Sequence, residues 1–212
     1  MLPNGLVVTL EMALRSMGAS SIRTDATRQA ALLLGMFRED VIVLRPFGLA
    51  LPSPSFGHLW PRSKKYCNKR FDIAVKVARA EGPLAGDFQL GRALHVLIDM
   101  ACPAHAIPIA HYLKDPFERY VDAHASKLST LSVAEFTVDR SATPGDLVSS
   151  LAEAARTLWN QKSDGLEKRV PIAEQARHLI PLAAAHVCAM VALYEREVRD
   201  MQYRQRSARA FR

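Results

Sequence analysis

The sequence predicts an all-α fold, organised as one multi-helix domain. Apolar residues recur at the spacing of one helix face, and Ala, Leu, Arg and Glu are plentiful, whereas β-branched runs such as DVIVL are short. With 212 residues and 49% apolar composition, the chain is long enough to build a complete core in a single domain. We therefore expect a bundle of six or seven helices over residues 1–200, followed by a basic tail over residues 201–212.

The expected helices follow from apolar periodicity and from stop signals. The first has its apolar face between Leu6 and Met17 and ends at Gly18, and the second runs from about Ser20 to Gly35. Further helices are expected over about residues 68–81, 86–101, 147–159 and 171–200.

A long loop is expected between the second and third helices. Residues 45–66, RPFGLALPSPSFGHLWPRSKKY, contain four prolines and show no helical period. Loops of this length inside compact domains are usually functional or disordered, so we expect this one to contribute to a functional site. A second long connection is expected around residues 127–145.

The charge and hydropathy of the chain limit its partners and location. The net charge is +7, and part of the excess lies in the C-terminal run RQRSARAFR. Such a tail can contact phosphates on lipid or nucleic acid, although a solvated terminus is the simpler interpretation. No run approaches the roughly 18–20 apolar residues of a transmembrane segment. The first residues make a poor secretory signal, so the chain as given is expected in the cytosol.

Cysteines and late histidines are interpreted as structural residues. Cys67, Cys102 and Cys188 show no C-x-x-C spacing, which argues against a disulfide framework or a thiolate zinc finger, and we expect them to be small buried residues. His178 and His186 lie on the last expected helix, and we interpret both as core or interface histidines.

The segment LHVLIDMACPAH carries the clearest functional pattern. His95 and Asp99 lie one helical turn apart, which places them within about 40° of each other around the helix axis. A carboxylate in so apolar a helix is costly unless it is paired or binds a metal. Pro103 ends the helix nearby, so His105 can turn back towards the same cavity. The alternative is a buried, hydrogen-bonded His–Asp pair.

Two other segments supply residues of the same chemical kind. Glu39 and Asp40 end the second expected helix, and His58 lies in the long loop. Imidazole and carboxylate ligands without thiolates suit zinc or a similar divalent ion.

The third segment, AHYLKDPFERYVD, holds His111 and Glu118. Asp115, Pro116 and Glu118 match the N-cap, first and third positions of a capping box, so Glu118 has a purely structural interpretation. The alternative is that His111 and Glu118 converge with His105 if the intervening turn folds back.

The run His95-x-x-x-Asp99-x-x-x-Pro103-x-His105 resembles the core motif of the zinc-dependent phospholipase C family and of the related single-strand-specific zinc nucleases. The flanking LGRAL and DPFERYVD are similar to bacterial members, as is an acidic pair followed by an aromatic-flanked His. The resemblance spans about residues 35–122. It implies an all-helical fold that holds up to three zinc ions.

The resemblance also implies a ligand set. By position, Asp40, His58 and His95 hold one zinc, and Asp99 bridges it to a neighbouring ion. His105 and Glu118, helped by a further His, hold another.

In the family phospholipase that further His lies four residues before the Glu, where this chain has Lys114. His111 is the nearest substitute. Family members also use their mature N-terminal residue and an early His, but this chain has no His before His58. Either a segment precedes Met1, in which case the protein is expected to be exported, or one metal site is lost. We therefore expect two zinc ions, because a third would lack these ligands.

The implied activity is that of a phosphoric diester hydrolase in which zinc activates a water molecule. Asp40 is the expected catalytic residue, since it would both bind metal and orient or deprotonate that water. A phospholipid substrate, with peripheral contact to a membrane, is the first expectation. Single-stranded nucleic acid is the alternative, because Phe47, Phe56 and Trp60 could receive acyl chains or stacked bases. A third hypothesis is a non-catalytic helical module that retains metal binding.

Overall fold

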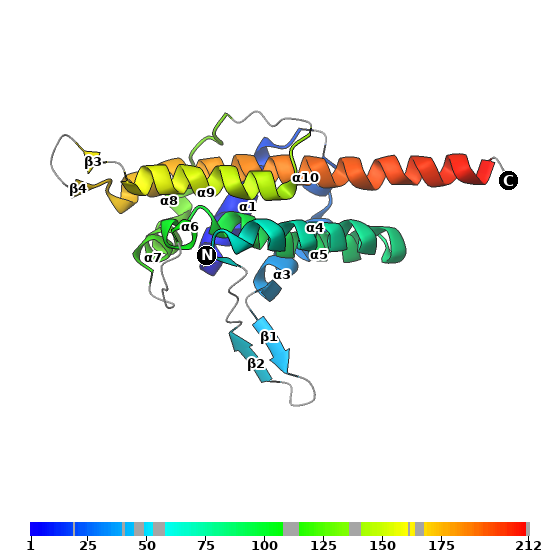
Figure 1. The fold of residues 1–212 in the computed structure, drawn as a ribbon, viewed down its shortest axis with the longest axis horizontal. Coiled ribbons are helices and arrows are strands. Elements are labelled where there is room, and N and C mark those ends of the chain that lie inside the picture. Colours follow the sequence, from blue (N-terminus) through cyan, green and yellow to red (C-terminus); the bar gives the residue numbers. More distant parts are fainter. Residues whose placement is uncertain are drawn as a thin grey trace.

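The structure is a computed structural model that describes residues 1–18, 20–39, 41–44, 49–52, 58–107, 115–135, 141–160, 162–163 and 168–210. These residues form a helical bundle with two short antiparallel hairpins (Figure 1), so the predicted all-α class is confirmed. The helices are α1 (Pro3–Ser16), α2 (Ser21–Thr24), α3 (Ala26–Glu39), α4 (Arg62–Glu81), α5 (Pro83–Asp99), α6 (Pro103–Ala106), α7 (Pro116–Ala123), α8 (Ala125–Leu128), α9 (Pro144–Asn160) and α10 (Ile172–Ala210). The strands are β1 (Val41–Leu44) paired with β2 (Leu49–Pro52), and β3 (Lys162–Ser163) paired with β4 (Lys168–Arg169).

The helices differ from the expected ranges before α3 and before α4, and a local cap explains the first difference. The second expected helix is divided into α2 and α3, because the Asp25 carboxylate accepts hydrogen bonds from the backbone N–H groups of Thr27 and Arg28 and starts a new helix. Helix α4 begins at Arg62, inside the predicted loop, and the β1–β2 hairpin also falls partly within that range. The long connection is therefore more regular than the sequence predicted.

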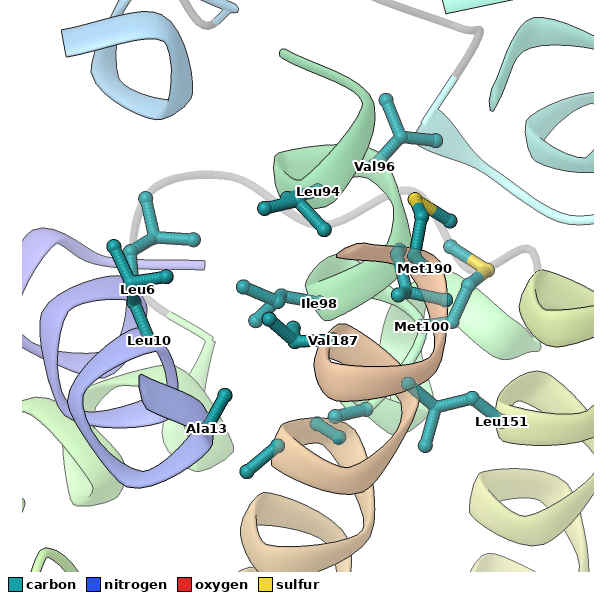
Figure 2. Packing of buried hydrophobic residues seen from close by; sticks show 14 of the residues in the cluster. Leu6, Leu10, Ala13, Leu94, Val96, Ile98, Met100, Leu151, Val187 and Met190 are labelled. Carbon is teal, nitrogen blue, oxygen red and sulfur yellow. The ribbon is translucent and has the colours of Figure 1, made fainter. Parts of the chain in front are cut away.

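Helix α5 is the centre of the molecule. It packs along α3 and α4, and it contacts α1, α9 and α10 as well. Figure 2 shows Ile98 of α5 between Leu6 of α1 and Val187 of α10. Every residue from Ala93 to Asp99 is buried, as expected for a helix that is apolar on all sides. The His–Asp motif therefore lies at the end of the most enclosed helix.

Two glycines allow α3 and α5 to approach closely. A Cβ atom at Gly35 would lie 1.9 Å from the backbone oxygen of Phe88, and one at Gly91 would lie 2.0 Å from the backbone oxygen of Leu32. Neither carbonyl can move without moving its helix, so both positions require glycine. This crossing brings the C-terminal half of α3 against the motif-bearing half of α5.

Helix α10 runs along the bundle and continues past it to Ala210 (Figure 1). Its segment Ile172–Arg199 is long and apolar enough to cross a membrane, with a window of mean hydropathy 1.5, although the sequence prediction expected no such run. Within that window 67% of the residues are buried in the protein, so the apolar face of α10 is used for packing.

Candidate metal centre

His95 and Asp99 face each other at the C-terminal end of α5. His95 Nε2 lies 3.2 Å from Asp99 Oδ2, and neither residue has exposed surface. His95 Nδ1 lies 2.9 Å from the backbone oxygen of Met36 on α3. Because a carbonyl oxygen only accepts, Nδ1 of His95 carries a proton, and Nε2, which faces Asp99, is the nitrogen that a metal ion could bind. The α3–α5 crossing thus selects the tautomer that a metal ligand needs.

The segment before α4 brings His58 to the same place. The backbone N–H of Trp60 donates to the backbone oxygen of His105 at 3.0 Å, which fastens this segment to α6. His58 Nδ1 then lies 2.9 Å from Asp99 Oδ2, and its ring centroid lies 5.0 Å from that of His95. One ligand atom from each of His58, His95 and Asp99 lies within 4.8 Å of the other two.

A second group of ligand atoms lies on α6 and α7. Asp115 caps α7 as predicted, because its Oδ1 accepts from the backbone N–H groups of Phe117 and Glu118. The Glu118 side chain faces the site, and its Oε1 lies 3.3 Å from His105 Nε2. Cys102 joins them, and one ligand atom from each of Cys102, His105 and Glu118 lies within 4.8 Å of the other two.

Asp99 lies between the two groups. Its Oδ2 faces His58 and His95, and lies 3.8 Å from His105 Nδ1. Its Oδ1 lies 2.5 Å from the Met1 amino group, which also lies 2.9 Å from Glu118 Oε1. One carboxylate therefore touches both ligand groups, which is the arrangement expected of a bridging ligand.

The carboxylates of the site are held in their charged forms. Burial alone would raise the pKa of Asp99, but the charges of His95, the Met1 amino group and His105, with a hydrogen bond from His58, hold that pKa well below its usual value. Burial also opposes ionisation of Glu118, yet the hydrogen bond from His105 and the Met1 amino group lower its pKa to about 2.

Glu39 forms a separate ionic cluster beside His58. Its carboxylate is buried and accepts from Tyr66, from Arg70 and, at 2.5 Å, from Arg92, while Oε1 lies 3.7 Å from His58 Nε2. Burial opposes its ionisation, but hydrogen bonds from His58 and Tyr66 and the charge of Arg70 lower the pKa of Glu39 to about 2. Both carboxylate oxygens are engaged by cations, so Glu39 suits orientation of His58 rather than metal binding.

The remaining sequence-predicted positions fall into two classes. Asp40, His111 and Lys114, like Phe47 and Phe56, lie outside the described residues. Trp60 is described, and the Arg156 guanidinium lies 4.6 Å from its ring centroid and covers one face.

The two late histidines differ from each other. His186 is buried, with Nδ1 2.8 Å from the backbone oxygen of Leu182 and Nε2 3.2 Å from Ser150 Oγ, so its interpretation as a core residue is confirmed. His178 is exposed, so it is not a core residue, and its interpretation as an interface histidine stays a prediction. Eight residues advance a helix by about 80° beyond two full turns, enough to carry a side chain from core to solvent.

Sequence reasoning missed Cys102 and the contact of Glu39 with His58. It also left the Met1 amino group out of the site, although the family resemblance implies an N-terminal ligand. For Cys102 a signal existed, because it lies three residues before His105 with only Pro103 and Ala104 between them. The Met1 contact joins residues 98 positions apart, and no local pattern indicates it.

The donor set fits zinc. Imidazole nitrogens and carboxylate oxygens are ligands that zinc accepts, and the thiol of Cys102 adds a further one. The Met1 ammonium lies between Asp99 and Glu118, which indicates that this place favours positive charge. The described residues therefore include two adjacent groups that could each hold a metal ion.

Comparisons with known proteins show what the fold resembles. No family model matches the sequence, and no curated protein matches it. Among solved structures, the alpha-toxin of Clostridium perfringens from avian strain SWCP matches with a TM-score of 0.65 and 11% identity over 93% of this chain. The alpha-toxin of Clostridium absonum matches with a TM-score of 0.58 and 14% identity over 94% of this chain. The chain covers 63% and 66% of these toxins, less than two thirds of their length. The chain therefore shares the all-α fold of the clostridial alpha-toxins.

Proposed function

We propose that this protein is a metal-dependent phosphoric ester hydrolase of the phospholipase C kind. The observation that carries the proposal is the position of Asp99 between two adjacent ligand groups. Its Oδ2 lies near His58 and His95 of the first group and 3.8 Å from His105 Nδ1 of the second, while Oδ1 contacts the Met1 amino group. The motif resemblance and the alpha-toxin-like fold support the same conclusion independently.

In this proposal His58, His95 and Asp99 hold one zinc ion, and Asp99, His105 and Glu118 hold a second. When bound, two adjacent divalent ions supply a water of lowered pKa and stabilise the charge of the leaving oxygen. The chain's own residues do the positioning. The Met36 carbonyl orients His95, and the low pKa of Glu118, about 2, keeps this ligand ionised at neutral pH. Asp40, outside the described residues, is the proposed residue that orients or deprotonates the water.

The proposed substrate is a phospholipid. A cavity of about 360 Å³ lies against α6 and α7, the helices that carry His105 and Glu118, and its lining includes Phe117, Trp159 and Ile172. This mainly apolar lining, which also includes Asp115 and Gln175, could receive acyl chains. Trp60, a described aromatic residue of the predicted loop near His58, has one face covered by Arg156, which makes it a poor platform for base stacking.

Metal quantification followed by two activity assays tests the proposal. Protein purified without chelator should contain about two equivalents of zinc and should hydrolyse a choline phospholipid in mixed micelles. His58→Ala should abolish this activity, because it removes a ligand of the first group. His124→Ala is the matched control, since His124 is exposed and stacks on Tyr120.

Three results would contradict the proposal. Protein without stoichiometric metal would favour a non-catalytic helical module. Hydrolysis of single-stranded DNA with no action on phospholipid would assign the site to nuclease chemistry. Full activity of the His58→Ala variant would remove His58 from the site.

A further inference from the structure

Cys102 lies where α5 ends and α6 begins. It is fully buried, and it precedes His105 by three residues, so the short α6 turn places the two side chains on neighbouring faces. Its Sγ lies within 4.8 Å of a ring nitrogen of His105 and of a carboxylate oxygen of Glu118. The same three-residue group is in contact with Asp99 through His105.

The other two cysteines have different surroundings. Cys67 is equally buried, but its Sγ faces the backbone oxygen of Ala93 at 3.5 Å. Cys188 is half-buried, and its Sγ lies 3.4 Å from the backbone oxygen of Ala13. Among the described residues, neither of these two thiols belongs to a group of potential metal ligands. Burial alone therefore does not explain why the Cys102 thiol lies beside an imidazole and a carboxylate.

We propose that Cys102 is a thiolate ligand of the second metal ion, which it holds together with His105 and Glu118. The inference rests on the proposed function and assigns a ligand within its site. On binding, the thiol proton passes to solvent and a sulfur–metal bond forms in its place. Asp115 Oδ1, 3.5 Å from Sγ, accepts the hydrogen bond of the thiol before the ion arrives. With the bridging Asp99, the second ion would have four protein ligands, so water or substrate would enter by expansion to five-coordination.

A thiolate changes which ions this group selects. Soft sulfur ligands favour zinc over magnesium, calcium and manganese, which prefer oxygen. The second group should therefore retain zinc in a large excess of magnesium. The first group, made of imidazoles and a carboxylate, should discriminate less between zinc and other transition ions.

Cobalt substitution tests the assignment without measuring activity. Metal-free protein is reconstituted with Co²⁺, and the near-ultraviolet thiolate-to-cobalt charge-transfer band is recorded. Wild type should show the band, and Cys102→Ser should lose it while keeping the visible bands of cobalt bound to imidazole. Cys67→Ala and Cys188→Ala are the matched controls, and both should keep the charge-transfer band.

X-ray absorption of the zinc-loaded wild-type protein provides a second measurement that needs no variant. A zinc–sulfur shell at about 2.3 Å is expected beside the nitrogen and oxygen shell. A spectrum with nitrogen and oxygen ligands alone would overturn the thiolate assignment, as would a charge-transfer band that persists in Cys102→Ser. Either result leaves the proposed hydrolase intact, whereas failure of wild type to bind cobalt or zinc would overturn both.

Discussion

Single residues of the site are fixed by partners that lie on other elements. The Met36 carbonyl sets the tautomer of His95, and the Glu39 cluster lies against the outer nitrogen of His58. The sequence predicted the ligand types because the i, i+4 spacing of His95 and Asp99 is visible in one helix. It did not predict the role of Glu39, because Tyr66 and Arg70 reach that carboxylate from a helix that begins more than twenty residues later.

Replacing the shared carboxylate should release metal without unfolding the protein. Asp99→Asn keeps the shape of the side chain but removes the charge that two ions would share. We expect bound zinc to fall below one equivalent, measured by elemental analysis, while far-ultraviolet circular dichroism stays unchanged. Asp72→Asn, at an exposed position of α4, is the control. Wild-type zinc content in Asp99→Asn would count against bridging.

Acid should destabilise the protein partly through His186. Burial lowers the pKa of His186 from 6.5 to about 4. Between these values the unfolded chain binds a proton that the native state excludes, so lowering the pH favours unfolding. The contribution of neutral His186 to the free energy of unfolding is fully present only above about pH 6.5. It amounts to about 3 kcal/mol at most.

The measurement is denaturant unfolding between pH 7 and pH 4, compared with His186→Gln. The variant should lose less stability over this window, because glutamine does not titrate. Equal slopes for the two proteins would exclude His186 as a cause. Asp99, Glu39 and Glu118, whose pKa values are lowered, should weaken the fold at still lower pH.

Among the secondary-structure elements, the long helices were predictable from the sequence, whereas the break between α2 and α3 and the β1–β2 hairpin were not. Strong apolar periodicity predicted the ranges of α1, α4, α5 and α9 to within several residues, whereas α10 continues ten residues beyond its predicted end at residue 200. The break between α2 and α3 depends on one Asp25 cap, and the β1–β2 hairpin lies in a proline-rich stretch that has no alternating pattern. In the sequence, the glycines of the α3–α5 crossing indicate only a lower helix propensity. Their role in close packing could not be predicted, because it depends on two helices meeting.

Adding a methyl group at that crossing should damage both fold and site. In Gly91→Ala the new Cβ would lie 2.0 Å from the Leu32 backbone oxygen, so α3 must move away from α5. We expect a net loss of at least about 1 kcal/mol in the free energy of unfolding, since overpacking outweighs the better helix propensity of alanine. Zinc affinity should fall as well, because Met36 moves with α3.

Gly18→Ala is the matched control for this substitution. A Cβ there has no heavy atom within 4 Å, so stability should change by less than about 0.5 kcal/mol. Urea unfolding and zinc titration of both variants check the expectation. A Gly91→Ala protein with unaltered stability would show that the crossing adapts.

For the whole molecule, bound metal should contribute to stability. The candidate ligands come from the segment before α4 and from or beside the helices α5, α6 and α7. A metal ion would therefore join elements that are distant along the chain. A ligand that binds only the native state stabilises it by about 3 kcal/mol at a hundredfold excess over Kd.

Thermal unfolding with and without a chelator measures this contribution. The midpoint should fall on zinc removal and recover when zinc, but not magnesium, is restored. Asp99→Asn should show almost no response to either treatment. A midpoint that ignores the chelator in zinc-loaded wild type would mean that metal does not tie these elements together.

The hydrogen bond from the Trp60 backbone N–H to the His105 carbonyl couples the positions of the two ligand groups. His58 enters one group only two residues before this bond, and His105 belongs to the other. Any displacement of the turn before α4 is therefore transmitted to α6. Metal binding to one ligand group should then restrict the motion of the other ligand group. Occupancy at the two halves would then rise in a cooperative rather than an independent manner.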